Sequence, residues 1–253
     1  MESESNETIF ERVAQFLRQQ RNIYGDFETQ INSTYTEKSI KDDLVSEPET
    51  NFELAQPSTI EKKLAACSSL TELKSLCEES EVLKTDLNNT NLVFGTGNPT
   101  ADLMIIGEAP GKSEDQQGVP FIGKAGKLLD KILNAINFNR NDVYIANILK
   151  HRPPQNRDPK PDERKRSLPF LLKQIELVNP KLILCAGKVS GNTLLNSDLS
   201  LKQMRQKFHD FNGIELMVTY HPAALLRNEQ WKKPTWEDVQ LLRARYDELK
   251  GNP

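Results

Sequence analysis

The 253-residue sequence predicts an α/β domain built around a parallel sheet. Short apolar runs such as 103–106 (LMII) and 182–186 (LILCA) have the length and composition of buried strands. Between such runs lie longer segments in which leucine and isoleucine recur at helical spacing, as in 125–136. Strands and helices therefore alternate along the chain, and this alternation is typical of βαβ units in a parallel sheet.

Local signals place each element in order. Residues 60–83 are amphipathic and are expected to form one or two helices. Asp162 is expected to cap a helix that ends at Pro180, and Thr235 is expected to open a capping box with Asp238. The expected strands are 91–95, 103–106, 143–148, 182–186 and 215–220. The expected helices that follow them are 125–136, 162–179, a helix through 194–195, and 235–249.

Residues 1–60 are predicted to be an acidic, partly disordered extension ahead of a folded domain at 61–253. The extension carries 5 Lys/Arg and 12 Asp/Glu, a net charge of -7, whereas the remainder has a net charge of +4. One candidate helix, 11–24, could dock on a partner or on the chain's own core, and a frayed helix fits its pattern equally well. A mildly basic domain behind an acidic extension is compatible with nucleic-acid binding.

Composition also bounds the class of protein. Three cysteines, at positions 67, 77 and 185, are too few and too scattered for a disulfide framework, which favours a reducing compartment. No apolar run approaches the ~20 residues that span a bilayer. The acidic N-terminus lacks the features of a secretory signal. We therefore expect a cytoplasmic, nucleoid-associated protein with no membrane contact.

The segment 103–130 is expected to hold a ligand. It runs from an apolar strand to an amphipathic helix through a loop with five glycines, two prolines and three acids. A βα loop this long and this rich in glycine usually binds something rather than only turning the chain. In parallel sheets, ligands lie beyond the carboxyl ends of the strands. Four loops, GEAPG, NILKHRPPQNR, GKVS and YHPAALLR, are therefore expected to meet at one edge.

Single residues at this edge carry suggestive chemistry, although each has a plainer explanation. Glu108 follows a strand and could hold or deprotonate a water, but it could be a surface carboxylate in a turn. Phe121 could stack on a planar ligand or fill the core. Asn147 could read a nucleobase edge or cap a strand. His221 could donate to an oxygen that becomes anionic, but a lone histidine before a proline is normally unremarkable.

The tripeptide 225–227 (LLR) pairs two apolar side chains with a cation. Such a pair suits insertion at a base step with a flanking phosphate contact, although a short helix with inward leucines is the simpler explanation.

The order of these motifs resembles the uracil-DNA glycosylase superfamily, and most closely its family 4. The resemblance runs from Leu92 to the C-terminus and includes GEAPG, GVPFIGKAGKLLD, YIANILKHRPPQNR and TYHPAALLR. GEAPG in place of a glutamine-aspartate motif separates the chain from family 1. The resemblance implies a three-layer αβα sandwich with a central, mainly parallel, four-stranded sheet.

The resemblance also implies a role for each matching position. Glu108 would hold the catalytic water, with Glu114 supporting it, and His221 would stabilise charge on uracil O2. Phe121 would stack on the flipped base, and Asn147 would read its Watson–Crick edge. The residues expected to line the site nearby are Ala109 and Asn156. Those expected to contact DNA are Lys124, Lys188, Ser190, Leu225, Leu226 and Arg227.

The chain departs from family 4 at the positions that hold a four-iron four-sulfur cluster in similar proteins. These positions correspond here to Cys77, Ser80, His151 and Ser167. Only one thiolate remains, and serine is a poor ligand for cluster iron. We therefore predict no cofactor, with apolar packing of 70–83 on Phe170 and Leu171 as a hypothesis for its replacement. His151 could alternatively be reactive, as a histidine is in the covalent family X enzymes.

These observations predict a monofunctional uracil-DNA glycosylase that initiates base-excision repair. The alternatives are a DNA- or partner-binding relative that has lost turnover, and a glycosylase for hypoxanthine or other deaminated bases. The expected partner is uracil-containing DNA, single- or double-stranded, bound by a monomer. A repair or replication partner could bind the N-terminal extension.

Overall fold

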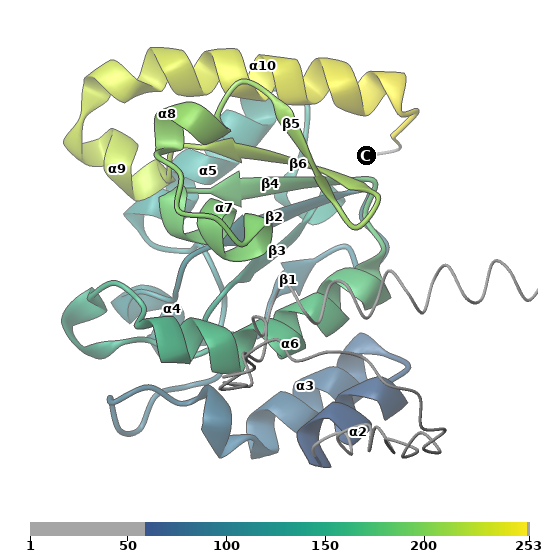
Figure 1. The fold of residues 1–253 in the computed structure, drawn as a ribbon. Coiled ribbons are helices and arrows are strands. Elements are labelled where there is room, and N and C mark those ends of the chain that lie inside the picture. The colour runs from purple at the N-terminus through teal and green to yellow at the C-terminus, as the bar shows by residue number, and fades with distance from the viewer. Residues whose placement is uncertain (1–58, 252–253) are drawn as a thin grey trace, which may run out of the picture. The chain divides into compact units, whose positions relative to one another are not determined.

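The computed structural model of the chain describes residues 59–251 (Figure 1). Nearly all of the predicted extension 1–60, including its candidate helix 11–24, lies outside the described residues. The domain boundary at 60/61 therefore stays a prediction.

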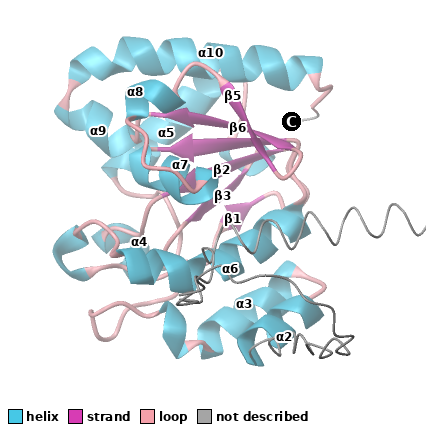
Figure 2. Cartoon of the chain, viewed as in Figure 1, coloured by secondary structure: helices cyan, strands magenta, loops and turns pink. Residues whose placement is uncertain are grey.

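A six-stranded sheet in the order β1-β3-β2-β4-β6-β5 forms the centre of the described fold (Figures 1 and 2). Its four central strands are parallel, and β1 and β5 are antiparallel to their neighbours. The strands are β1 (Thr96–Gly97), β2 (Leu103–Gly107), β3 (Tyr144–Asn147), β4 (Leu182–Ala186), β5 (Phe208–Phe211) and β6 (Ile214–Thr219). The predicted α/β class and parallel core of four strands are confirmed, with a short antiparallel strand added at each edge.

Helices cover both faces of the sheet, which gives three layers. On one face, α5 (Lys124–Ala135) and α10 (Lys232–Glu248) share an apolar core with alternate residues of β2, β3 and β4. On the other face lie α6 (Pro161–Val178) and α7 (Lys188–Leu195). Gln174 of α6 donates a hydrogen bond to the Tyr144 hydroxyl of β3, and Gly191 of α7 lies against Val218 of β6. Shorter helices are α4 (Lys112–Gln117), α8 (Leu201–Met204) and α9 (Pro222–Arg227), and the 3₁₀ turns are Glu81–Leu83, Arg140–Asp142, Pro154–Asn156 and Glu229–Trp231.

Two N-terminal helices pack on the outer side of α6. They are α2 (Thr59–Ala66) and α3 (Leu70–Glu79), so the predicted helical region 60–83 forms two helices and a 3₁₀ turn. Ser69 caps α3 by accepting the Glu72 N–H. A second apolar cluster joins Leu73, Leu76 and Cys77 of α3 to Phe170 of α6. Leu171, the other residue named in the packing hypothesis, is also fully buried.

The structure corrects three predicted elements. The predicted strand 91–95 is irregular. Its apolar residues Val93 and Phe94 are buried, but their backbone bonds do not form a strand ladder: the Val93 N–H donates to the Lys150 carbonyl, and the Phe94 carbonyl accepts from the side chains of Lys150 and Gln174. Asp162 is not the helix cap that was predicted, because α6 begins at Pro161 after the N-cap Lys160 and Asp162 lies in its first turn. Thr235 does not start α10 but lies inside it, with its hydroxyl donating to the Trp231 carbonyl.

The β5–β6 hairpin was not predicted, although the sequence contains a turn signal at Asn212-Gly213. Asn212 and Gly213 both have positive φ, 55° and 82°. Asn-Gly at such a two-residue turn is a strong hairpin signal.

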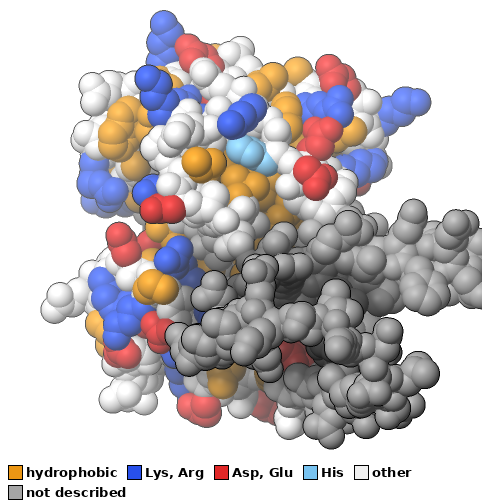
Figure 3. Space-filling model, in the orientation of Figure 1, with side chains coloured by type: hydrophobic (Ala, Val, Ile, Leu, Met, Phe, Trp, Pro, Cys, Tyr) orange, Lys and Arg blue, Asp and Glu red, His pale blue; other side chains and the backbone are white. Residues whose placement is uncertain are grey.

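Charge on the visible face is mixed. Figure 3 shows Lys and Arg side chains interspersed with Asp and Glu over the described residues, rather than gathered in one stripe. Among those residues, no helix combines the length and the apolar character that crossing a membrane requires.

Phe170→Ala should test the contact between α3 and α6. Phe170 is 1% exposed and joins the apolar cluster of α3 to the main domain, so its truncation should cost about 3–5 kcal/mol. Urea unfolding would measure this loss. Phe208→Ala, at a partly buried edge of the sheet, is the control and should cost less. Equal losses would show that the α3 contact contributes little.

Candidate active site

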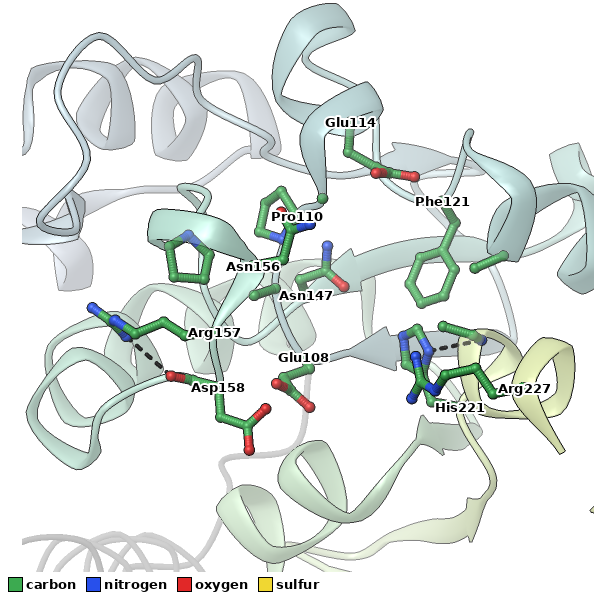
Figure 4. Close-up of a pocket in the computed structure, with 15 residues that line it drawn as sticks. Glu108, Pro110, Glu114, Phe121, Asn147, Asn156, Arg157, Asp158, His221 and Arg227 are labelled. Atoms are coloured by element: carbon green, nitrogen blue, oxygen red, sulfur yellow. Dashed lines mark hydrogen bonds between the residues drawn. The ribbon is translucent and has the colours of Figure 1, made fainter.

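The register of the parallel strands brings the predicted site residues together. Gly107 at the end of β2 pairs with Asn147 at the end of β3, so the loops that follow them start side by side. The end of β6 leads into His221 from the other side of β4. A pocket of about 350 Å³ lies at this edge (Figure 4). Its lining includes the predicted residues Glu108, Ala109, Glu114, Phe121, Asn147, Asn156, His221 and Arg227.

Glu108 projects into the pocket from the residue after β2 (Figure 4). Burial, and then the negative charge of Asp158, raise the pKa of its carboxyl group to about 7, although the charge of Arg164 acts in the opposite direction. Figure 4 shows the carboxyl groups of Glu108 and Asp158 in the same part of the pocket. Glu108 can therefore exchange a proton near neutral pH. Asp158, in the loop before α6, and Arg164, on α6, were missed, because their sequence does not show that their charges lie near Glu108.

His221 is a neutral hydrogen-bond donor. Burial, and then the charge of Arg227, lower the pKa of its imidazole to about 4. Its Nδ1 accepts a hydrogen bond from the Ala223 N–H at 3.1 Å, so the proton of the neutral ring lies on Nε2. Gly187 makes room for this side chain, because a Cβ there would lie 3.2 Å from the Cβ of His221. The strand end thus presents one N–H donor without a charge.

Phe121 and Asn147 meet over Gly107. A Cβ on Gly107 would lie 2.4 Å from Asn147 Oδ1 and 2.5 Å from Phe121 Cζ, so only glycine allows both side chains to approach. The ring of Phe121 also stacks on His221, with 5.4 Å between centroids. Asn147 is 2% exposed, and its Oδ1 has no hydrogen-bond partner among the described residues. A buried carbonyl oxygen without a donor is costly unless a ligand satisfies it.

Lys150 fixes the backbone of Asn147 from behind. Its fully buried ammonium donates to the carbonyl of Asn147 at 3.0 Å, the carbonyl of Phe94 at 3.4 Å, and the side-chain oxygen of Gln174. Burial lowers its pKa to about 8, but three acceptors require all three ammonium protons. Lys150 was missed by sequence reasoning, since a lysine after an apolar strand normally faces solvent.

Glu114 supports the loop that carries Phe121. Its Oε1 accepts the N–H groups of Ile122 and Gly123 at 3.0 and 2.9 Å. Phe121 itself has a φ of +53°, a left-handed conformation that is unfavourable for an aromatic residue. The hydrogen bonds of Glu114 hold the next two residues in place.

Comparison with known proteins agrees with this geometry. The model of the uracil DNA glycosylase superfamily matches residues 94–241, more than half of the chain. The chain belongs to the uracil-DNA glycosylase superfamily. A type-4 uracil-DNA glycosylase of Archaeoglobus fulgidus is 38% identical over 174 residues, covering 66% of this chain and 86% of that protein. Type-4 enzymes of Saccharolobus solfataricus and Thermotoga maritima are 43% and 39% identical, covering 60% and 62% of this chain and 75% and 84% of theirs.

The residues expected to contact DNA in this superfamily member differ in accessibility. Arg227 is exposed and lines the pocket, and Leu226 is 49% exposed. Leu225 is only 1% exposed, because it lies on the inward side of the short helix α9. It therefore does not fit the predicted role in the duplex gap. The predicted pair of inserting leucines is thereby reduced to Leu226.

The remaining predicted phosphate contacts also separate into two kinds. Lys124, at the start of α5, is exposed, as is Lys188, which lies 3.5 Å from Asp198. Ser190 does not fit the prediction, since it is fully buried and its hydroxyl donates to the Gly187 carbonyl. It stabilises the first turn of α7 instead.

The four cluster positions do not suit a four-iron four-sulfur cluster. The hydroxyl groups of Ser80 and Ser167 donate to the Leu76 and Ile148 carbonyls at 2.6 and 2.7 Å. Burial raises the pKa of the Cys77 thiol to about 12, which opposes thiolate formation. The buried His151 has its Nδ1 3.0 Å from the Thr90 hydroxyl. Within residues 59–251, no group of three or more His, Cys, Asp or Glu is placed to hold a metal ion.

Glu114→Ala and Glu114→Gln should separate a supporting role from one that needs charge. Alanine removes the acceptor of two backbone N–H groups and should cost about 2–3 kcal/mol of unfolding free energy. Glutamine keeps a carbonyl oxygen there and should cost under about 1 kcal/mol. Glu176→Ala, which removes an exposed partner of Lys173, is the control and should be nearly neutral. Equal losses for both Glu114 variants would contradict the supporting role.

Proposed function

We propose that the protein is a monofunctional uracil-DNA glycosylase, which extrudes uracil from DNA and hydrolyses its N-glycosidic bond to leave an abasic site. The observation that carries this proposal is the unpaired Oδ1 of Asn147, buried in a pocket that is also lined by the aromatic ring of Phe121, the carboxyl group of Glu108 and the neutral imidazole of His221. The type-4 uracil-DNA glycosylases that resemble the chain support it.

The pocket matches the hydrogen-bonding edge of uracil. Uracil presents a donor at N3 and an acceptor at O4, and the amide of Asn147 offers an oxygen and an NH₂ group to meet them. Cytosine presents an acceptor and a donor in the reverse order, so it would leave the Asn147 oxygen unpaired. Sites that hydrogen-bond a buried edge reject mismatched analogues strongly. Phe121 would supply a stacking face for the base.

The two titratable groups meet the charges that develop in the reaction. As the bond from C1′ to N1 breaks, its electron pair leaves with uracil, and the sugar becomes positive. The carboxylate of Glu108 would orient a water at C1′ and accept its proton as the new C–O bond forms. The Nε2–H of His221 would donate a hydrogen bond to uracil O2 and stabilise the anion. Because the imidazole is neutral, it keeps this proton while it donates the hydrogen bond.

Reaching the base requires that the nucleotide leave the stack. This step costs a few kcal/mol and is easier at a mismatch or in single-stranded DNA. The exposed Leu226 could fill the vacated position, and Arg227 beside it could contact a phosphate. Both lie on α9, directly after His221, so DNA contact and chemistry share one short segment.

The pH dependence of uracil excision tests the role of Glu108. The pKa of this carboxyl group is raised to about 7, and the reactive form is the carboxylate. The kcat/KM should therefore rise with pH up to about 7 and then level off, while His221 stays neutral across this range. Glu108→Gln should lower kcat by about 10²–10⁴-fold. Full activity in this variant would contradict the mechanism.

A charge variant near Glu108 sharpens this test. Asp158→Asn removes a negative charge that raises the pKa of Glu108, so the midpoint of the pH profile should move to lower pH. Asp210→Asn, on the edge strand β5, is the matched control and should leave the midpoint unchanged.

We also propose that the protein works without an iron–sulfur cluster. Its support is the donor set described above, in which two serine hydroxyls are already bonded to backbone carbonyls. Anaerobically purified protein should contain no stoichiometric iron or acid-labile sulfide, and should still excise uracil. As the control, Ser80→Cys, His151→Cys and Ser167→Cys together restore four thiols and should increase iron uptake on reconstitution. One cluster per wild-type chain would contradict the proposal.

A further inference from the structure

The backbone at Phe121 requires an external restraint. Its φ of +53° is rare for a residue with a bulky side chain, and such conformations persist only where the surroundings hold them. Glu114 binds the two N–H groups that follow. As a carboxylate it cannot bind the carbonyl groups of Pro120 and Phe121.

Arg140 binds those carbonyl groups. Its Nη1 donates to the Phe121 carbonyl at 3.0 Å, and its Nη2 donates to the Pro120 carbonyl. The same guanidinium contacts Asp130 Oδ1 at 2.9 Å, which anchors it to α5. The planar, always charged guanidinium suits this task, because its several N–H groups lie in a fixed geometry.

Gly126 completes the site that receives the Phe121 carbonyl. A Cβ on Gly126 would lie 1.8 Å from that oxygen, so any larger residue would push the turn away from α5. The Phe121 carbonyl is thus held by a charged donor on one side and a glycine surface on the other.

We propose that Arg140 is a positioning residue for base stacking, acting on the reaction only through Phe121. This inference rests on the proposed function. Without Arg140, two carbonyl groups lose their charged donor, and the turn can relax out of the left-handed conformation. The ring of Phe121 then leaves the face of the pocket, although Arg140 itself does not line that pocket.

A double-mutant cycle on uracil excision tests this coupling. Arg140→Gln should lower kcat/KM by roughly 10–100-fold, because small displacements at a site have effects of that order. In a Phe121→Leu background, the same substitution should lower kcat/KM less than about threefold, since the stacking ring is already absent. Arg140→Lys should be more active than Arg140→Gln, because it keeps a charged donor. It should be less active than the wild type, because one ammonium cannot reach all three acceptors. Additive losses in the cycle would overturn the proposal.

Arg243→Gln is a matched control for loss of stability. Arg243 also donates to two backbone carbonyls, those of Ile136 and Asn137, each at 3.4 Å, and it pairs with Asp247. It does not line the pocket. Its substitution should lower the Tm while changing kcat/KM less than about twofold. A loss of kcat/KM as large as that of Arg140→Gln would show that Arg140 has only a structural role.

A readout independent of activity separates this inference from the proposed function. The ring of Phe121 lies 5.4 Å from that of His221, so its ring current shifts the imidazole C–H resonances. Arg140→Gln should move the His221 resonances and leave those of His209, on β5, unchanged. Unmoved His221 resonances would overturn the positioning role. An inactive wild-type protein would contradict the proposed function alone.

Discussion

The site depends on one register contact, between Gly107 and Asn147 at the ends of two parallel strands. Parallel pairing aligns the strand ends, and the absence of a side chain on Gly107 lets Asn147 and Phe121 close over it. A one-residue slip would turn Asn147 to the opposite face of the sheet. Helices bury both faces of the sheet, which opposes such a slip. A slip would turn each apolar side chain of β2 and β3 toward the opposite helical layer and disrupt its packing there. The helices thus secure the pocket without lining most of it.

Burial shifts the two main titratable groups in opposite senses, and both shifts remove charge. It raises the pKa of Glu108 to about 7 and lowers that of His221 to about 4. Near neutral pH the pocket therefore holds a carboxyl group that is easily ionised and an imidazole that stays uncharged. A neutral base can enter such a site at little electrostatic cost, and the fixed donors act most strongly once charge develops. Lys150, which holds Asn147 from behind, is charged and fully buried, which is tolerated because three oxygens surround it.

The sequence was sufficient for the strand–helix order and for residues that directly follow strands, such as Glu108 and His221. Both positions depend on local patterns, a continuous apolar run followed by a turn. It was insufficient where a role depends on distant contacts: Arg140, Lys150 and Asp158 gain theirs only when loops meet in space. Leu225 and Leu226 show the same limit at closer range. The two are adjacent and chemically identical, yet one is buried and the other exposed, because a helical turn points them in different directions.

The proposal that no cluster is bound requires other contacts to hold the loop after β3, and the strengths of these contacts differ. The loop after β3 reaches the N-terminal region through Arg157 and Lys160, which both pair with Asp86. Asp86 is 59% exposed, so water and salt screen these pairs. The pair of Arg157 with the buried Glu163 is better protected, but it stays within the loop and α6. The loop also receives a hydrogen bond from the Thr85 hydroxyl at the Arg152 carbonyl, at 2.6 Å. The apolar contact of α3 with Phe170 differs from the exposed ion pairs, because burial of aromatic and aliphatic surface is not weakened by salt. Hydrophobic packing about α6 therefore helps to hold the loop after β3, and the N-terminal helices α2 and α3 are part of the enzyme's working structure.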